Sequence, residues 1–172
     1  MKKDLIIGDA DNFRRLILDL PPPASLGAGL CRTWDYWNRK RDGRTAPQRR
    51  DIDPIDMGRD LPGLVLYDVV RTASPATVRF RYRLTGSDTD RIHGRALKGH
   101  YVDSLDPPAF ATMLHDDFSV MTVRRAPQLA QLAFRNADGN RRSYEALRLP
   151  LVDDQGQVVM IMVYANHGQP QP

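Results

Sequence analysis

The stretch RFRYRLTG, residues 79–86, decides the fold prediction, because its charged and apolar side chains alternate strictly. Three arginines occupy the odd positions, whereas Phe80, Tyr82 and Leu84 occupy the even ones. Successive side chains of a strand point to opposite faces of a sheet, so the pattern predicts a half-buried strand. We expect the rings to face a packed interior and the arginines to face outward, paired with aspartates of residues 51–60 or with Asp68.

Further segments place this strand in an antiparallel sheet. LVLYDVV (64–70) precedes it across a Ser-Pro turn, and three more strand-like segments follow at 128–135, 142–152 and 157–165. The turns NADGN and DDQG between those three contain the Asp/Asn–Gly pairs typical of hairpins. Residues 158–164 are entirely apolar or aromatic, so we expect both faces of the last strand to be covered. The order predicts five antiparallel strands.

Helices are predicted before and within this sheet. Residues 12–20 have apolar side chains at helical spacing, with Asp11 as a candidate N-cap and three prolines at 21–23 as a stop. A second amphipathic helix begins after Ser25 and ends near Gly43, and its apolar positions are Leu26, Leu30, Trp34 and Trp37. Short helical turns are expected over 87–106 and a longer amphipathic helix over 107–124.

The expected organisation is therefore α+β, with one sheet domain at residues 61–166. An N-terminal helical extension and an irregular connector would occupy 1–60, and residues 167–172 would form a disordered tail. Charge is nearly balanced, with 25 Lys and Arg, 21 Asp and Glu and a net charge of +4. This balance does not by itself indicate a nucleic-acid partner.

Composition also limits the chemistry that the chain can perform. Cys31 is the only cysteine, so the chain can form no internal disulfide and no cysteine-based metal site. No signal peptide and no run near the roughly 20 apolar residues of a membrane span is present, which favours a cytoplasmic protein. We find no nucleophile elbow and no P-loop. Basic and aromatic side chains occupy opposite parities at 79–86, unlike those of RNA-binding sheets.

The sequence resembles the PAS-domain superfamily, specifically an alphaproteobacterial PAS-like family of unassigned function. The motifs that carry the resemblance cover about residues 30–105. They are Trp37 with RDG at 41–43, PQRRDIDP at 47–54, LPGLVLYDVV at 61–70, RFRYRLTG at 79–86 and GRALKG at 94–99. The resemblance implies a curved sheet that wraps a small cavity against short helices. Such domains bind a small molecule or cofactor, or serve as dimerisation modules.

We therefore expect a non-enzymatic sensory module in which a small ligand changes the packing of the N-terminal helices or the binding of a separate signalling protein. The expected ligand-binding side chains are Tyr82, Tyr101, Phe118, Met121, Tyr144 and Met160. The cofactor is not identified. His93 and His100 flank glycines where some PAS proteins hold haem, but no other feature supports haem. The HDD run at 115–117 does not suggest a metal, because adjacent helical residues diverge.

Two alternatives remain open at this stage. The first is a ligand-free dimerisation or interaction module, whose surface would include Trp34 and Trp37, because Trp is enriched at interfaces. Packing of these two rings against the outer face of the sheet is the simpler interpretation of the same helix. The second alternative is an enzyme on a related α+β cone fold, which would require a buried aspartate with a perturbed pKa near Tyr82.

Overall fold

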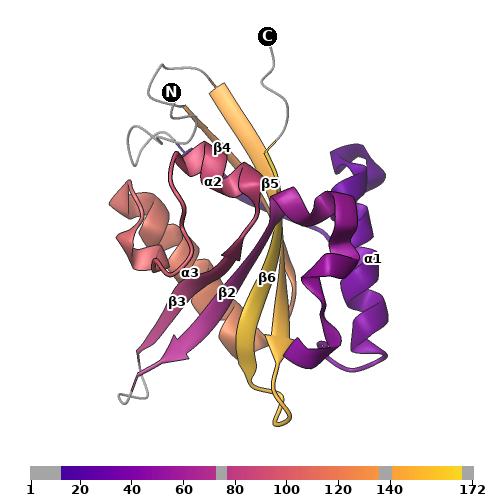
Figure 1. Ribbon diagram of the computed structural model, residues 1–172. Coiled ribbons are helices and arrows are strands. Elements are labelled where there is room, and N and C mark those ends of the chain that lie inside the picture. The colour runs from indigo at the N-terminus through magenta and orange to yellow at the C-terminus, as the bar shows by residue number, and fades with distance from the viewer. Residues whose placement is uncertain (1–12, 73–76, 136–140, 168–172) are drawn as a thin grey trace.

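The computed structural model describes residues 13–72, 77–135 and 141–167, and Figure 1 shows the arrangement. Six strands of this part form one antiparallel sheet in the order β1-β4-β5-β6-β2-β3. Their bounds are β1 Phe13–Leu18, β2 Leu64–Arg71, β3 Val78–Thr85, β4 Gln128–Arg135, β5 Arg141–Val152 and β6 Val158–Asn166. The helices are α1 Ala28–Arg41, α2 Ser87–His93 and α3 Pro108–Arg124. Short 3-10 turns lie at Ala24–Leu26, Arg49–Asp51, Pro54–Gly63 and Val102–Ser104.

The predicted α+β class and antiparallel sheet are confirmed, but the helix predicted over 12–20 is wrong. Its residues form β1, which pairs with β4 in unbroken register from Phe13 opposite Phe134 to Leu18 opposite Leu129. A nine-residue helix followed by three prolines is marginal in isolation. The open edge of β4 instead offers this segment a full ladder of backbone hydrogen bonds. The described part of the sheet therefore has six strands, and α1 is the one α-helix that precedes β2 within residues 13–63.

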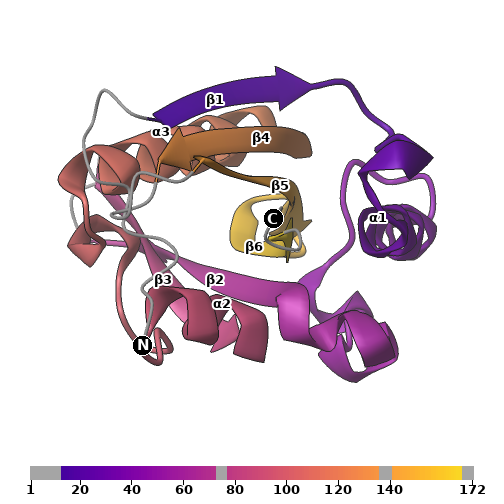
Figure 2. The ribbon, with the colours of Figure 1, turned by 90° about the horizontal axis from the view of Figure 1, so that it is seen from above.

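The sheet is curved, and α1 and α3 cover its two faces (Figure 2). On the convex face α1 packs against β5 and β6, where the Trp37 indole donates a 3.0 Å hydrogen bond to the Pro150 carbonyl. On the concave face lies α3, whose buried stripe is Phe110, Leu114, Phe118 and Met121, as the sequence pattern predicts. Central β6 is largely buried along its length, which confirms that both its faces are covered.

Helix ends differ in detail from the predictions. Gly27 rather than Ser25 occupies the N-cap of α1, and Asp42 adopts the left-handed C-cap conformation one residue before Gly43. The DDQG turn between β5 and β6 forms as predicted, with the Gly156 amide donating to the Asp153 carbonyl. Asp11, the Ser-Pro turn, the NADGN turn and the tail beyond residue 167 lie outside the described residues.

Candidate functional site

Aromatic side chains fill the concave side of the sheet. Phe80 and Tyr82 are 1% and 2% exposed, which confirms the predicted inward direction of these two side chains, whereas Leu84, beyond a register shift between β2 and β3, is only partly buried. The ring of Tyr67, on neighbouring β2, lies 4.6 Å from that of Tyr82 and 4.8 Å from that of Phe118. Phe118 also meets Phe80 edge to face at 5.3 Å. Strands β2 and β3 and helix α3 thus share one aromatic cluster.

The arginines of β3 point to the opposite face, also as predicted. Arg81 pairs with Asp68 at 2.9 Å, whereas Arg79 forms a two-point ion pair with Asp103, a partner that the sequence did not indicate. Asp60, an expected partner, instead pairs with Arg32 of α1. Paired guanidinium groups on a solvated face are typical of a structural surface.

Three buried tyrosine hydroxyls stay protonated at neutral pH. Burial raises the pKa of Tyr67 to about 12, and it raises the pKa values of Tyr82 and Tyr144 as well. A side-chain hydrogen bond joins Tyr67 to Tyr82. Tyr144 projects from β5 and adds a third phenol to this side of the sheet. It is close enough to the other two that ionisation of one hydroxyl would raise the pKa of another. The cluster therefore offers neutral hydroxyl groups within an apolar surround.

The α2 end of this cluster is more polar. His167, just after β6, lies against Tyr144 with ring centroids 4.9 Å apart and the ring planes tilted by 41°. It is also close enough to His93 of α2 for a charge on one imidazole to act on the other. Burial lowers the pKa of each imidazole to about 4, so both are neutral at physiological pH. His167 Nε2 and the buried Thr89 hydroxyl have no hydrogen-bond partner among the described residues. Buried polar groups without a hydrogen-bond partner are rare in native proteins, so these two require an explanation.

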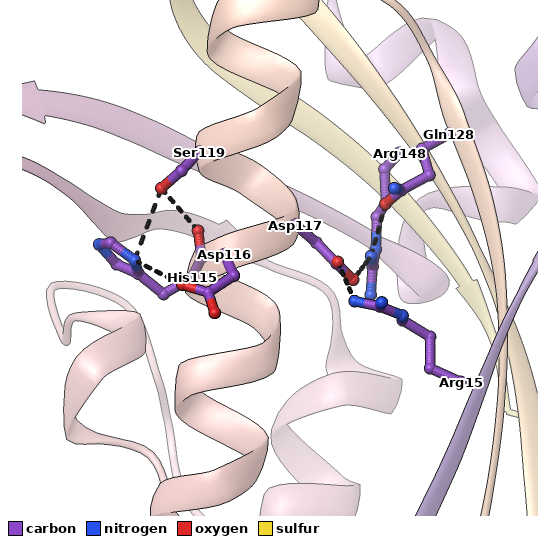
Figure 3. Close-up of polar contacts among 7 residues, drawn as sticks. All are labelled: Arg15, His115, Asp116, Asp117, Ser119, Gln128 and Arg148. Atoms are coloured by element: carbon purple, nitrogen blue, oxygen red, sulfur yellow. Dashed lines mark hydrogen bonds and ion pairs between the residues drawn. The ribbon is translucent and has the colours of Figure 1, made fainter.

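A buried ion cluster connects the aromatic interior to β1 (Figure 3). Arg148 of β5 is 1% exposed, and its Nη1 donates to Asp117 Oδ2 at 2.6 Å and to Gln128 Oε1 at 2.7 Å. Arg15 of β1 donates to the other carboxylate oxygen of Asp117. Arg148 Nε has no hydrogen-bond partner in the part of the chain that the structure describes, and the guanidinium lies 5.6 Å from the Phe118 ring. One carboxylate thus links β1, α3 and β5.

His115, Asp116 and Ser119 lie on another side of α3 and do not form a catalytic triad (Figure 3). His115 Nδ1 is 3.5 Å from the Ser119 hydroxyl and 3.8 Å from Asp116, whereas Nε2 contacts the Val78 carbonyl at 2.9 Å. A triad requires the nucleophile and the carboxylate on different ring nitrogens. Burial is the main cause of the raised pKa of Tyr82, and the side chains that add to or oppose this shift are Tyr67, Tyr144 and Arg95.

A sequence model described as the PAS domain matches residues 28–164. The chain belongs to the PAS domain family. The light-state structure of the blue-light photoreceptor Aureochrome1 LOV is 12% identical, with a TM-score of 0.45, over 63% of this chain and 83% of that chain. A cysteine-to-serine variant of Vivid is 13% identical, with a TM-score of 0.45, over 78% of this chain and 98% of that chain. A PAS domain from Colwellia psychrerythraea is 11% identical, with a TM-score of 0.44, over 69% and 100%.

No curated protein matches the chain significantly. Within the described part of this PAS domain, no helix is long and apolar enough to cross a membrane. The same residues contain no group of three or more His, Cys, Asp or Glu side chains arranged to hold a metal ion.

The structure brings four of the six predicted ligand-binding residues to the concave side of the PAS sheet. Tyr82, Phe118, Met121 and Tyr144 are all buried there. Met160 is not brought to this side, because it lies opposite Asp68 and Leu151, hence on the other face. The step of one residue along a strand reverses the direction of a side chain.

Tyr101 also lies apart from the other predicted ligand-binding residues. It lies beside β3 on the arginine face, where the Arg79 guanidinium covers its ring at 3.8 Å. Gly99, with φ of +88°, turns the chain back along β3 and so sets this position. Of the two predicted interface tryptophans, Trp37 is 2% exposed and packs on the sheet, and Trp34 stacks on it while remaining half-buried.

Sequence analysis missed Tyr67, Asp117 and Arg148. An available signal was the inward parity of Arg148 with Tyr144, four residues earlier on the same strand. Two surface hollows flank α3, one lined by Arg15, Met113 and Asp117 among others, the second by Asp103, Asp106 and His115 among others. Neither hollow is lined by the tyrosine cluster.

Proposed function

We propose that this PAS domain is a regulatory sensor that binds a small molecule against Tyr82 and Tyr144, beneath α2. The observation that carries the proposal is His167, whose Nε2 has no hydrogen-bond partner among the described residues and whose ring lies 4.9 Å from that of Tyr144, close to the neutral imidazole of His93. Small-molecule sites combine apolar walls with a few such polar groups. Entry would require α2 to move, since the cluster is buried.

The buried ion cluster supplies a route from this site to β1. The positive charge of Arg148 acts on Tyr67 and Tyr144, and Arg148 shares Asp117 with Arg15. A ligand that favoured one arrangement of the tyrosines would shift the position of Arg148. Because Arg148 shares Asp117 with Arg15, this shift would strengthen or weaken the ion pair that attaches β1. The output is non-enzymatic and passes through the N-terminal segment to a separate signalling protein. We place such a module in the cytoplasm of an alphaproteobacterium, in keeping with the sequence resemblance.

A ligand-free dimerisation module is the second candidate. Neither surface hollow is lined by the tyrosine cluster, and edge-to-face packing of Tyr67, Phe80 and Phe118 fills the space near α3. Half-buried Trp34 would then contribute to the interface.

Native mass spectrometry of the purified chain separates the two candidates. The sensor predicts a co-purified molecule, or one found by thermal-shift screening, whose binding is lost in Tyr144→Phe and kept in Tyr164→Phe. Tyr164 is the matched control because it lies on the opposite face, against Gly29 of α1. A chain without any ligand by either method, but with a concentration-dependent dimer mass, would favour the second candidate.

A further inference from the structure

Strand β1 lies outside the matched part of the family, which begins at residue 28, yet it completes the sheet. It covers the edge of β4 with six consecutive residue pairs, Phe13–Leu18 against Leu129–Phe134. An open strand edge is a template for pairing with another extended segment. Residues 28–164 alone would leave the β4 edge exposed, so β1 occupies a ready-made strand-binding site.

Few side chains hold β1 in that site. Arg15 donates to Asp117, and Leu18 is partly buried against the core. Leu16 and Ile17 are 56% and 47% exposed, although both are large and apolar. Among the side chains that the structure describes, one ion pair and one apolar contact thus supplement the backbone ladder, which is how sheet edges bind extended peptides.

The connector from β1 to α1 is semi-rigid. Residues 19–27 include the three consecutive prolines and no strand, and Figure 2 shows them running from the end of β1 across to α1. Proline-rich segments are extended and stiff. Such a connector can direct β1 away from its own sheet toward a second copy as well as along its own β4. A stiff hinge that resists folding back favours exchange of an element between copies.

We propose that β1 exchanges between two copies of this chain, so that Phe13–Leu18 of one copy pairs with β4 of the other. In this dimer Arg15 pairs with the partner's Asp117, and the partner's Arg15 pairs with Asp117 of the first copy. Every ladder and ion-pair contact is then kept, which makes exchange a low-cost route to a symmetric dimer. The exposed side chains of Leu16 and Ile17 give the second copy apolar surface to cover. The exchange does not depend on a ligand.

A mixed-cysteine experiment on the full chain tests this directly. Leu16→Cys and Gln131→Cys are made as separate variants in a Cys31→Ser background, because these two positions are cross-strand partners. The two proteins are mixed at high concentration, incubated and oxidised. Pairing of β1 of one copy with β4 of the other holds the two cysteines side by side, so a disulfide-linked heterodimer forms efficiently. We expect that product, and we expect it to exceed the one from Leu16→Cys mixed with Val123→Cys, whose exposed cysteine reports random collision.

Two further variants make the result decisive. The double variant Leu16→Cys/Gln131→Cys should form a disulfide in any assembly, which shows that the geometry permits the bond. If it does so while the mixed single variants do no better than the collision control, β1 stays in its own copy and the proposal is overturned. Arg15→Ala should accelerate exchange about tenfold, the factor expected for loss of a charged hydrogen bond. Arg14→Ala, exposed on the other face of β1, should leave the rate unchanged.

Discussion

Arg15 of β1 and Asp117 of α3 are hydrogen-bonded although 102 positions separate them in the sequence. The other oxygen of the same carboxylate accepts from Arg148, which is buried beside the aromatic cluster. The N-terminal strand, the long helix and the centre of the sheet therefore meet at one negative charge.

Replacing Asp117 should destabilise the protein strongly. Asp117→Asn removes the charge that compensates Arg148, and an uncompensated buried charge costs about 3 kcal/mol or more. The neighbouring side chain of Asp116 is 72% exposed, so Asp116→Asn should change the free energy of unfolding by less than about 0.5 kcal/mol. Urea denaturation measures both. Equal stabilities for the two variants would show that the buried pair does not hold these elements together.

The Tyr67–Tyr82 hydrogen bond should appear as a coupling energy. In a double-mutant cycle of Tyr67→Phe and Tyr82→Phe we expect a coupling of about 0.5–1.5 kcal/mol, because each single variant leaves a buried hydroxyl unpaired. Thermal or urea unfolding gives the four free energies. The pair Tyr82→Phe and Tyr101→Phe is the control, since Tyr101 lies on the other face. A coupling no larger than that of the control would contradict the hydrogen bond.

Gly29 should tolerate no side chain while Tyr164 is present. A Cβ at Gly29 would lie 2.2 Å from the Tyr164 hydroxyl, so Gly29→Ala should destabilise the fold by about 1–3 kcal/mol. Alanine is otherwise the better helix former by up to about 1 kcal/mol. The same substitution in a Tyr164→Ala background should therefore be neutral or stabilising. A Gly29→Ala effect of the same sign and size in both backgrounds would show that the close approach is not its cause.

The free energy of unfolding should decrease as the pH is lowered below about 6.5. Burial lowers the pKa of His93 and of His167 from 6.5 to about 4 in the folded chain. Between these values the unfolded chain binds more protons, so the stabilisation present above pH 6.5 is lost as pH falls toward 4. We expect on the order of 2 kcal/mol for each imidazole.

Variants assign this pH dependence. His93→Gln should flatten the curve of unfolding free energy against pH between 6.5 and 4, whereas exposed His100→Gln should leave it unchanged. Carboxylates titrate in the lower part of this range in every variant, so the difference between variants isolates the imidazole. Identical curves for His93→Gln and the parent chain would mean that His93 is solvated.

Parity and periodicity predicted the elements whose burial is decided locally. The alternation of Phe80 and Tyr82 predicted the inward face of β3, and the stripe through Phe118 predicted α3. The β1 segment was mistaken for a helix because six residues fit either period, and its state depends on the edge of β4 more than 100 positions away.

The candidate site was predictable only in part for the same reason. Tyr82 and Tyr144 have the correct parity on their own strands, but Met160 is displaced by one residue from the parity of Ile161, which faces Tyr67 across β2 and β6. The ion pairs of Asp117 connect residues whose order in the sequence carries no sign of their proximity. The inward position of Arg148 on β5 was a local sign of such a pair, because a buried guanidinium needs a carboxylate close to it.

The proposed sensor depends on coupling of the tyrosine interior to β1 through Arg148 and Asp117. Residue-by-residue hydrogen exchange of the β1 amides, followed by NMR, measures this coupling. We expect Tyr67→Phe to change exchange at Leu16 and Leu18, and Tyr164→Phe on the opposite face to leave it unchanged. Unchanged β1 exchange in Tyr67→Phe, with altered signals around Phe80 and Phe118 proving that the interior was perturbed, would contradict the coupling.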